Sequence, residues 1–363
     1  MLPPEVYENA SAHIENNRRI DFELAGLLLL DGDLVQLGRL ADSARRKRVG
    51  DKVYFIRNYH LYYTNICAWH CDFCAFSRRP GAVDAYSKTI SQITHELEDL
   101  APEIMEIRVT GGINPALPSD YYLDLVACIR QKLPDVQIEA FAATEISFIA
   151  HKMKLPVREV LLQLKAAGLN ALTAGGAEIF NRDLRQKLCP HKPSIQEWIE
   201  VTKTAHQLGI PSNASILFGH LESYEDWLTQ LFALRELQDE TGGFNSFIPL
   251  VFLPQNTRLR DHPPLNFSEV LKMLAIARLI LDNFKYIKFL WIYYGLEQVR
   301  QALQYGVNDL AGTVYERHKG VARSAGSVSP AYQTQEDLLK AIQDCQRIPV
   351  ERGRFYEEKY VWG

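Results

Sequence analysis

Apolar residues recur along this chain in two alternating patterns, which together predict a regular series of strands and helices. Short runs rich in β-branched and aromatic residues predict strands, and stretches with apolar residues three or four positions apart predict helices. Eight strands are expected, at residues 53–63, 106–110, 137–141, 171–173, 213–218, 246–252, 287–293 and 306–310. Helices are expected at residues 88–100, 120–132, 145–153, 156–167, 194–208, 224–240, 267–283 and 297–305. This alternation favours an α/β fold, a (βα)8 barrel of the TIM type.

Two flanking segments fall outside the alternation. Residues 1–50 predict helices without strands, and we expect them to form an N-terminal helical cap on the barrel. Residues 51–333 would form the barrel itself, because no linker rich in glycine, serine or proline divides them. Residues 334–363 predict a C-terminal helix and an extended tail packed on the barrel.

Composition argues against a nucleic-acid-binding protein. Of the 363 residues 47% are hydrophobic, which is enough for a large buried core. The formal charge of −4 does not suit a nucleic-acid binder, which would present a basic face. The one basic run, residues 45–48, is short, and we expect it to be a solvated helix end. We therefore expect no nucleic-acid partner.

No segment predicts membrane insertion or export. The apolar run at residues 27–30 is far too short to span a bilayer. Met1 is not followed by a charged and then apolar leader. The cysteines are clustered rather than paired, which fits a reducing compartment. We expect a cytoplasmic protein.

Three of the six cysteines, Cys67, Cys71 and Cys74, lie within eight residues. Thiolates this close together on a loop can all point at one soft metal centre. Three is the informative number, because closed structural zinc sites and fully ligated iron–sulfur clusters both take four ligands. The spacing therefore predicts a four-iron cluster with one iron left open for a small molecule. The alternative is a zinc site completed by His70 or Cys189.

The spacing Cys-x3-Cys-x2-Cys is the signature of the radical S-adenosylmethionine (SAM) enzymes, which this chain resembles. Phe73, directly before the third cysteine, matches the aromatic residue that this superfamily places beside the adenine. The resemblance implies a [4Fe-4S] cluster on Cys67, Cys71 and Cys74, with SAM bound to the open iron. It also implies that an electron from the cluster cleaves SAM to a 5′-deoxyadenosyl radical.

Candidate cofactor-binding residues follow the predicted strands, where barrel enzymes keep their chemistry. Gly111 and Gly112 let a ligand approach the backbone closely. The resemblance implies that this glycine motif accepts the amino group of SAM. Glu145 and Glu178 offer carboxylates for ribose hydroxyls or for the amino group. The alternative for each glutamate is a place in the first turn of a helix, where the helix dipole favours it.

His220 and Glu222 are the candidate catalytic residues. A histidine on the rim can transfer a proton or bind a substrate carboxylate. Asn65, Asn213 and Asp309 are candidate substrate-binding residues. Asp309 closes the last predicted strand, so we expect its side chain to point to the same rim.

Longer stretches narrow the resemblance within the superfamily. They are residues 175–179, 219–222, 234–244, 247–250, 281–283, 287–288, 308–309 and 312–313. These stretches are similar to the menaquinone-pathway radical SAM enzymes, and above all to the aminofutalosine (aminodeoxyfutalosine) synthase family. The resemblance implies that the deoxyadenosyl radical adds to the vinyl carbon of an aromatic enolpyruvyl substrate, 3-[(1-carboxyvinyl)oxy]benzoate, which then loses a carboxylate. It further implies a one-electron donor such as flavodoxin or ferredoxin.

The chain departs from the synthase pattern at Ala174, Ser215, Leu253 and Arg317, several of them at strand ends where substrate is read. Two alternatives therefore stay open. One is a sibling radical SAM enzyme, of the cyclic dehypoxanthinyl futalosine synthase or FO synthase type, which begins by abstracting hydrogen from another substrate. The other is a non-catalytic iron–sulfur or zinc-binding barrel protein.

Overall fold

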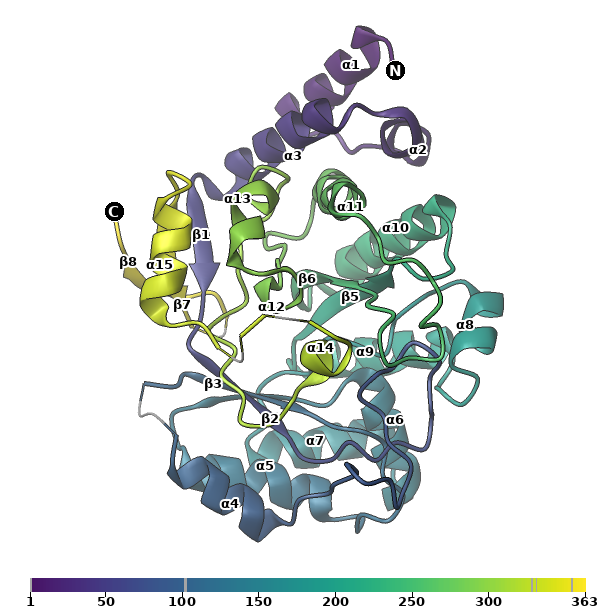
Figure 1. Cartoon of the computed structure of the whole chain (residues 1–363), viewed down its shortest axis with the longest axis vertical. Coiled ribbons are helices and arrows are strands. Elements are labelled where there is room, and N and C mark those ends of the chain that lie inside the picture. The colour runs from purple at the N-terminus through teal and green to yellow at the C-terminus, as the bar shows by residue number, and fades with distance from the viewer. Residues whose placement is uncertain (1, 101–102, 328, 331, 354) are drawn as a thin grey trace.

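Parallel strands in chain order form the wall of a barrel, and helices cover its outside (Figure 1). The computed structural model describes residues 2–363 except 101–102, 328, 331 and 354. The longer wall strands are β2 (Asn58–Tyr62), β3 (Glu106–Thr110), β4 (Gln137–Ala140), β5 (Ser212–Phe218) and β6 (Phe244–Val251). β2, β3 and β4 pair in parallel, and so do β5 and β6.

Short extended segments close the wall between these strands. Ala171 pairs with Glu139 of β4, and the backbone N–H of Leu172 donates to the carbonyl of Pro211 at 2.9 Å. Ile287 pairs with Phe247 of β6. The last segment, around residue 309, bridges residue 288 on one side and residue 54 on the other. The eight wall positions thus follow chain order, which confirms the predicted barrel.

Two predicted strands are shorter than expected. The segment predicted at residues 287–293 pairs only at its start, because residues 291–294 form a helix, α12 (Trp291–Tyr294). The strand predicted at residues 53–63 is divided into β1 (Lys52–Phe55) and β2. β1 pairs with β7 (Ile348–Arg352), and β7 pairs with β8 (Glu358–Val361), so the extended tail forms a second, small sheet with β1.

Helices surround the barrel, and several of them begin at a residue whose side chain accepts a hydrogen bond from a backbone N–H of the first turn. On the outer wall lie α4 (Ile90–Glu98), α5 (Tyr121–Lys132), α6 (Ala143–Met153), α7 (Val157–Ala167), α9 (Ile195–Gln207), α10 (Tyr224–Thr241) and α11 (Phe267–Ile280). α4 has a capping box of Thr89 and Gln92, and the side chain of Asn266 caps α11. Among the described helices, none has both the length and the apolar character needed to cross a bilayer.

The N-terminal helices and the shorter helices complete the fold. α1 (Pro4–Glu15), α2 (Phe22–Asp31) and α3 (Leu34–Val49) stand together at one end of the molecule, where α2 and α3 pack on α10 and α11 (Figure 1). The shorter elements are α8 (Arg182–Leu188), η1 (Leu296–Gln298), α13 (Val299–Ala302), α14 (Val321–Ser324) and α15 (Gln335–Gln343). The sequence patterns did not predict α8 or α14, because helices of seven and four residues are too short to show periodicity.

Candidate active site

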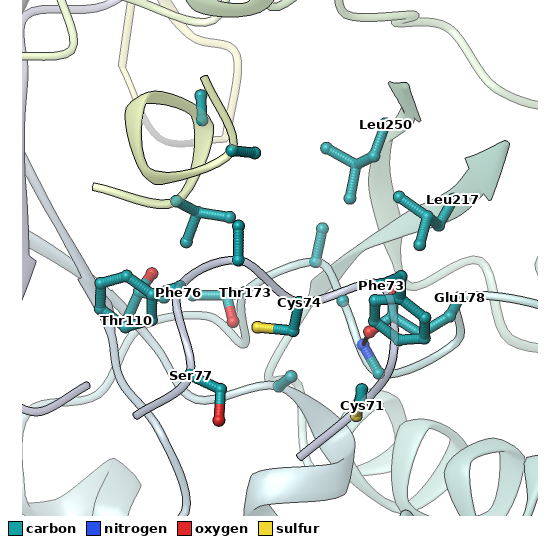
Figure 2. A pocket seen from close by; sticks show the side chains of 18 of the residues that line it. Cys71, Phe73, Cys74, Phe76, Ser77, Thr110, Thr173, Glu178, Leu217 and Leu250 are labelled. Carbon is teal, nitrogen blue, oxygen red and sulfur yellow. Dashed lines mark hydrogen bonds between the residues drawn. The ribbon is translucent and has the colours of Figure 1, made fainter. Parts of the chain in front are cut away.

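A cavity of about 320 Å³ opens at the carboxyl ends of the wall strands. The loop after β2 forms one side of it, and the ends of β5 and β6 form the other. Figure 2 shows Cys71, Phe73 and Cys74 on this loop, with Leu217 and Leu250 across the cavity. This is the end of a (βα)8 barrel at which catalytic sites lie.

Backbone hydrogen bonds hold the cysteine loop in place. The N–H of Cys67 donates to the carbonyl of Arg78 at 3.1 Å, and that of Ala68 donates to Ile113 at 2.7 Å. A turn joins Cys71 to Cys74, whose N–H donates to the Cys71 carbonyl at 3.0 Å. Cys67, Cys71 and Cys74 all line the cavity and form no disulfide. Burial raises the pKa of the Cys74 thiol, so its proton is held until a metal displaces it.

The donor set suits an iron–sulfur cluster with an open iron. Three thiols face one cavity, and the cavity continues past them with room for a ligand. Within the described part of the chain, no three His, Cys, Asp or Glu side chains converge closely enough to hold a single metal ion. Three thiols around one cavity can hold a four-iron cluster, which is larger than a single ion.

Gly111 and Gly112 line the cavity directly beside the cysteine loop. A β-carbon at Gly111 would lie 2.3 Å from the ring of Tyr63, and one at Gly112 would lie 2.3 Å from the carbonyl oxygen of Ile66. Both glycines are therefore required by the packing of the protein itself. Their role in SAM binding stays a prediction.

Glu145 lines the cavity and also lies in the first turn of α6, so its position is compatible with both predictions, a ligand-binding carboxylate and a helix-capping one. One carboxylate oxygen accepts from the N–H of Ala142 at 2.7 Å, and the other accepts from the hydroxyl of Tyr63 at 3.1 Å. Burial raises the pKa of Glu145 to about 7. A neutral or readily charged carboxyl group at the cavity wall can accept hydrogen bonds from a ligand's amino or hydroxyl groups.

Glu178 lines the cavity in a strained loop and pairs with a lysine. Its φ of 47° lies in the left-handed region, and its carboxylate accepts from the N–H of Gly176 at 3.1 Å. The ammonium of Lys192 forms an ion pair with it. Lys192 lies 5.6 Å from the ring centre of Phe73 and 5.8 Å from that of Trp69. Sequence reasoning missed Lys192, because a single lysine after a short helix carries no pattern.

The sequences of known proteins match nearly the whole chain. Residues 61–232 match the radical SAM superfamily, and residues 241–362 match the CofH/MqnC C-terminal region. The aminodeoxyfutalosine synthase of Thermus thermophilus is 41% identical over 96% of this chain and 95% of its own length. The chain belongs to the radical SAM superfamily. It is an enzyme of that superfamily, and its cofactors are a [4Fe-4S] cluster and SAM.

Two further comparisons show how far the similarity extends. The 5-amino-6-(D-ribitylamino)uracil–L-tyrosine 4-hydroxyphenyl transferase of Methanocaldococcus jannaschii is 34% identical over 91% of this chain and 94% of its own length. The crystal structure of methylornithine synthase superposes with a TM-score of 0.75 at 18% identity, covering 95% of this chain and 98% of that one. The latter likeness shows the fold, the radical SAM TIM-type barrel.

His220 and Glu222 do not line the cavity of this radical SAM enzyme. His220 is 3% exposed, and its Nε2 lies 3.1 Å from the carbonyl oxygen of Leu217. Its Nδ1 lies 2.9 Å from Oε2 of Glu222, and the other carboxylate oxygen, Oε1, accepts from the indole N–H of Trp227 at 2.8 Å. The pair thus organises the loop after β5. This geometry gives no support to the catalytic role predicted for these two residues.

The three predicted substrate-binding residues also lie outside the cavity lining. Asn65 donates to the carbonyl of Asp84 at 2.8 Å and holds the cysteine loop to the next segment. Asn213 donates to Glu139 at 3.2 Å inside the barrel. Asp309 does not point to the rim, because its carboxylate pairs at 2.9 Å with Arg352 from the C-terminal tail. These three residues hold parts of the barrel together. Of the three hydrogen bonds just described, only that of Asn213 goes to a side chain that lines the cavity, Glu139.

The sequence analysis missed a polar group inside the barrel. His60, Arg108 and Glu139 line the cavity, and strand register places them side by side. Arg108 Nε lies 3.0 Å from Glu139 Oε1, yet neither atom completes a hydrogen bond, and His60 Nε2 has no partner among the described residues. The available signal was a polar residue at the third position of each of three consecutive buried strands.

Two of the four departures from the synthase pattern reach the cavity. Ala174 and Leu253 line it. Ser215 is fully buried outside the lining, and Arg317 lies on the surface, where it pairs with Asp99 at 3.1 Å. Only Ala174 and Leu253 of this set are thus placed to change what the cavity accepts.

Proposed function

We propose that this enzyme transfers the 5′-deoxyadenosyl group of SAM to 3-[(1-carboxyvinyl)oxy]benzoate, with loss of a carboxylate, and so forms aminodeoxyfutalosine for menaquinone biosynthesis. The observation that carries the proposal is the 41% identity to the T. thermophilus synthase over nearly the full length of both chains. The cluster and SAM, when bound, supply the deoxyadenosyl radical. The protein's own task is to hold the acceptor against C5′ and to exclude competing reactants.

The cavity wall opposite the cysteine loop supports an aromatic acceptor. It is built from the apolar side chains of Leu217, Ile248, Leu250, Leu253, Leu290 and Ile292. Val321 and Ala322 of α14 add apolar surface, and Figure 2 shows α14 beside the cavity. An apolar wall binds a ring and keeps water away from a reactive intermediate.

The deeper part of the cavity offers polar positions to an acceptor that carries polar groups. His60 Nε2 and Arg108 Nε have no hydrogen-bond partner among the described residues. A ligand group that reaches them would satisfy buried atoms that are otherwise costly to leave unpaired. An acceptor with an apolar ring and polar substituents matches this division of the cavity.

A second candidate is a sibling reaction that begins with hydrogen abstraction. The match of residues 241–362 to the CofH/MqnC C-terminal region favours it, as does the 34% identity to the M. jannaschii transferase. In that case the enzyme would join a tyrosine-derived fragment to 5-amino-6-(D-ribitylamino)uracil. For either reaction we propose a soluble one-electron donor of the flavodoxin or ferredoxin type and a cytoplasmic location.

A panel of acceptors distinguishes these candidates. Anaerobically reconstituted enzyme is incubated with SAM and dithionite, either with 3-[(1-carboxyvinyl)oxy]benzoate or with L-tyrosine plus 5-amino-6-(D-ribitylamino)uracil, and products are identified by mass spectrometry. We expect aminodeoxyfutalosine from the first mixture and only background SAM cleavage in the second. Product from the second mixture alone would assign the sibling reaction, and absence of product from both mixtures would overturn both assignments.

A further inference from the structure

The segment that follows α8 lies directly against the middle ligand of the cysteine loop. The N–H of Asp72, next to Cys71, donates to the carbonyl of Leu188 at 2.8 Å. The N–H of Lys192 donates to the carbonyl of Cys189 at 3.0 Å, which folds residues 189–192 into a turn. Two side chains of this turn, Cys189 and Lys192, thereby come to the cluster site.

Cys189 provides a thiol beside a cluster ligand. It is 1% exposed, and its thiol interacts with that of Cys71. Once the Cys71 sulfur is bound to iron it carries no proton, so Cys189 is the partner that can donate S–H. A buried thiol in this position can donate a hydrogen bond to a metal-bound sulfur.

Lys192 provides a fixed positive charge at the same place. Its side chain is about 10% exposed, and its ammonium interacts electrostatically with the sulfurs of both Cys71 and Cys74. The ion pair with Glu178 and the rings of Trp69 and Phe73 keep the ammonium from moving out to solvent. A charge held in a partly dry site acts more strongly on its neighbours than one in water.

We propose that Cys189 and Lys192 are positioning residues that raise the reduction potential of the cluster through Cys71. Reduction adds one negative charge to the cluster and its thiolates. A hydrogen bond to a ligand sulfur and a nearby cation both stabilise the more negative, reduced state, and such outer groups are among the factors that set cluster potentials. The two residues would therefore make it easier for a one-electron donor to charge the cluster.

The test is a redox titration of reconstituted protein, followed by the electron paramagnetic resonance signal of the reduced cluster. We expect Cys189→Ala to titrate at a more negative midpoint potential than wild type. Cys189→Ser keeps a hydrogen-bond donor, so its midpoint potential should lie close to that of wild type. Lys192→Met removes the cation and should also shift the midpoint negatively, whereas Lys192→Met combined with Glu178→Gln removes both charges of the ion pair and should shift it less. Lys192→Arg should titrate close to wild type.

Matched controls separate this effect from general damage. Cys128→Ala removes another buried thiol that lies outside the cavity lining, and Lys187→Met removes an exposed lysine on α8. Both should titrate as wild type, and iron and sulfide are counted for every variant. Two separate positions are changed because one variant can fail to retain the cluster. If the variants that hold a full cluster titrate at the wild-type potential, the proposal is overturned.

Discussion

A β-carbon at Gly112 would lie 2.9 Å from the β-carbon of Cys67, so the glycine after β3 and the first cluster ligand are packed against each other. The same β-carbon would meet the carbonyl oxygen of Ile66 at 2.3 Å, a backbone atom that cannot swing aside. The cysteine loop therefore depends on a glycine more than forty residues later in the chain.

We expect Gly112→Ala to reduce cluster retention before it affects folding. The added methyl group must displace the loop that carries Cys67, whereas the barrel wall behind it need not move. The measurement is iron and acid-labile sulfide per chain after anaerobic reconstitution, together with the urea midpoint. Gly26→Ala on α2, where the new methyl group meets only an ordinary contact at 3.7 Å, is the control. A full cluster in Gly112→Ala would contradict this packing argument.

The pKa of Glu145 predicts a pH dependence of stability in the cofactor-free chain. Burial raises this pKa to about 7 from the ordinary value of 4.5, so the folded state binds the proton more tightly than the unfolded state. The stability from this group is fully present below about pH 4.5 and is lost as the pH rises through about 7. The shift corresponds to roughly 3 kcal/mol.

Glu145→Gln should remove this loss. We expect the free energy of unfolding of the variant, measured in urea between pH 5 and pH 8, to fall less steeply with pH than that of wild type. Glu159→Gln, which changes an exposed glutamate on α7, should keep the wild-type slope. Parallel profiles for Glu145→Gln and wild type would show that the carboxyl group is charged throughout this range.

The ion pair of Asp309 with Arg352 ties the C-terminal tail to the barrel interior. Both side chains are almost fully buried, so Arg352→Met leaves a carboxylate without its cation and should cost about 3–5 kcal/mol. Asp309→Asn in the same chain should recover part of that cost. Arg19→Met breaks a solvent-exposed pair with Asp239 and should cost at most about 1 kcal/mol. Urea midpoints measure all three, and equal losses for Arg352→Met and Arg19→Met would refute the assignment.

The fold and the cluster ligands could be predicted from the sequence because their signals are local. The strand and helix alternation gave the eight wall positions in order, and the spacing of Cys67, Cys71 and Cys74 identified the superfamily. Asp309 was misplaced for a non-local reason. Its position at the end of the last strand suggested the rim, but a partner 43 residues later, Arg352, holds it in the interior.

The rest of the site depends on contacts between distant segments, which periodicity does not report. Lys192 reaches the cluster loop only because the turn after α8 docks on Asp72. His220 was expected at the substrate because it follows a strand, yet its ring bonds back to the carbonyl of Leu217 near the end of β5. A position after a strand therefore does not show that a side chain faces the cavity, because the direction of the side chain determines what it contacts.

The most direct test of the account follows the fate of C5′. SAM labelled with carbon-13 at C5′ of its adenosine is incubated with reconstituted enzyme, dithionite and carbon-13-labelled 3-[(1-carboxyvinyl)oxy]benzoate, and the products are examined by NMR. We expect a one-bond carbon–carbon coupling between C5′ and the former vinyl carbon in a product that has lost a carboxylate. Label found only as the methyl group of 5′-deoxyadenosine would contradict it.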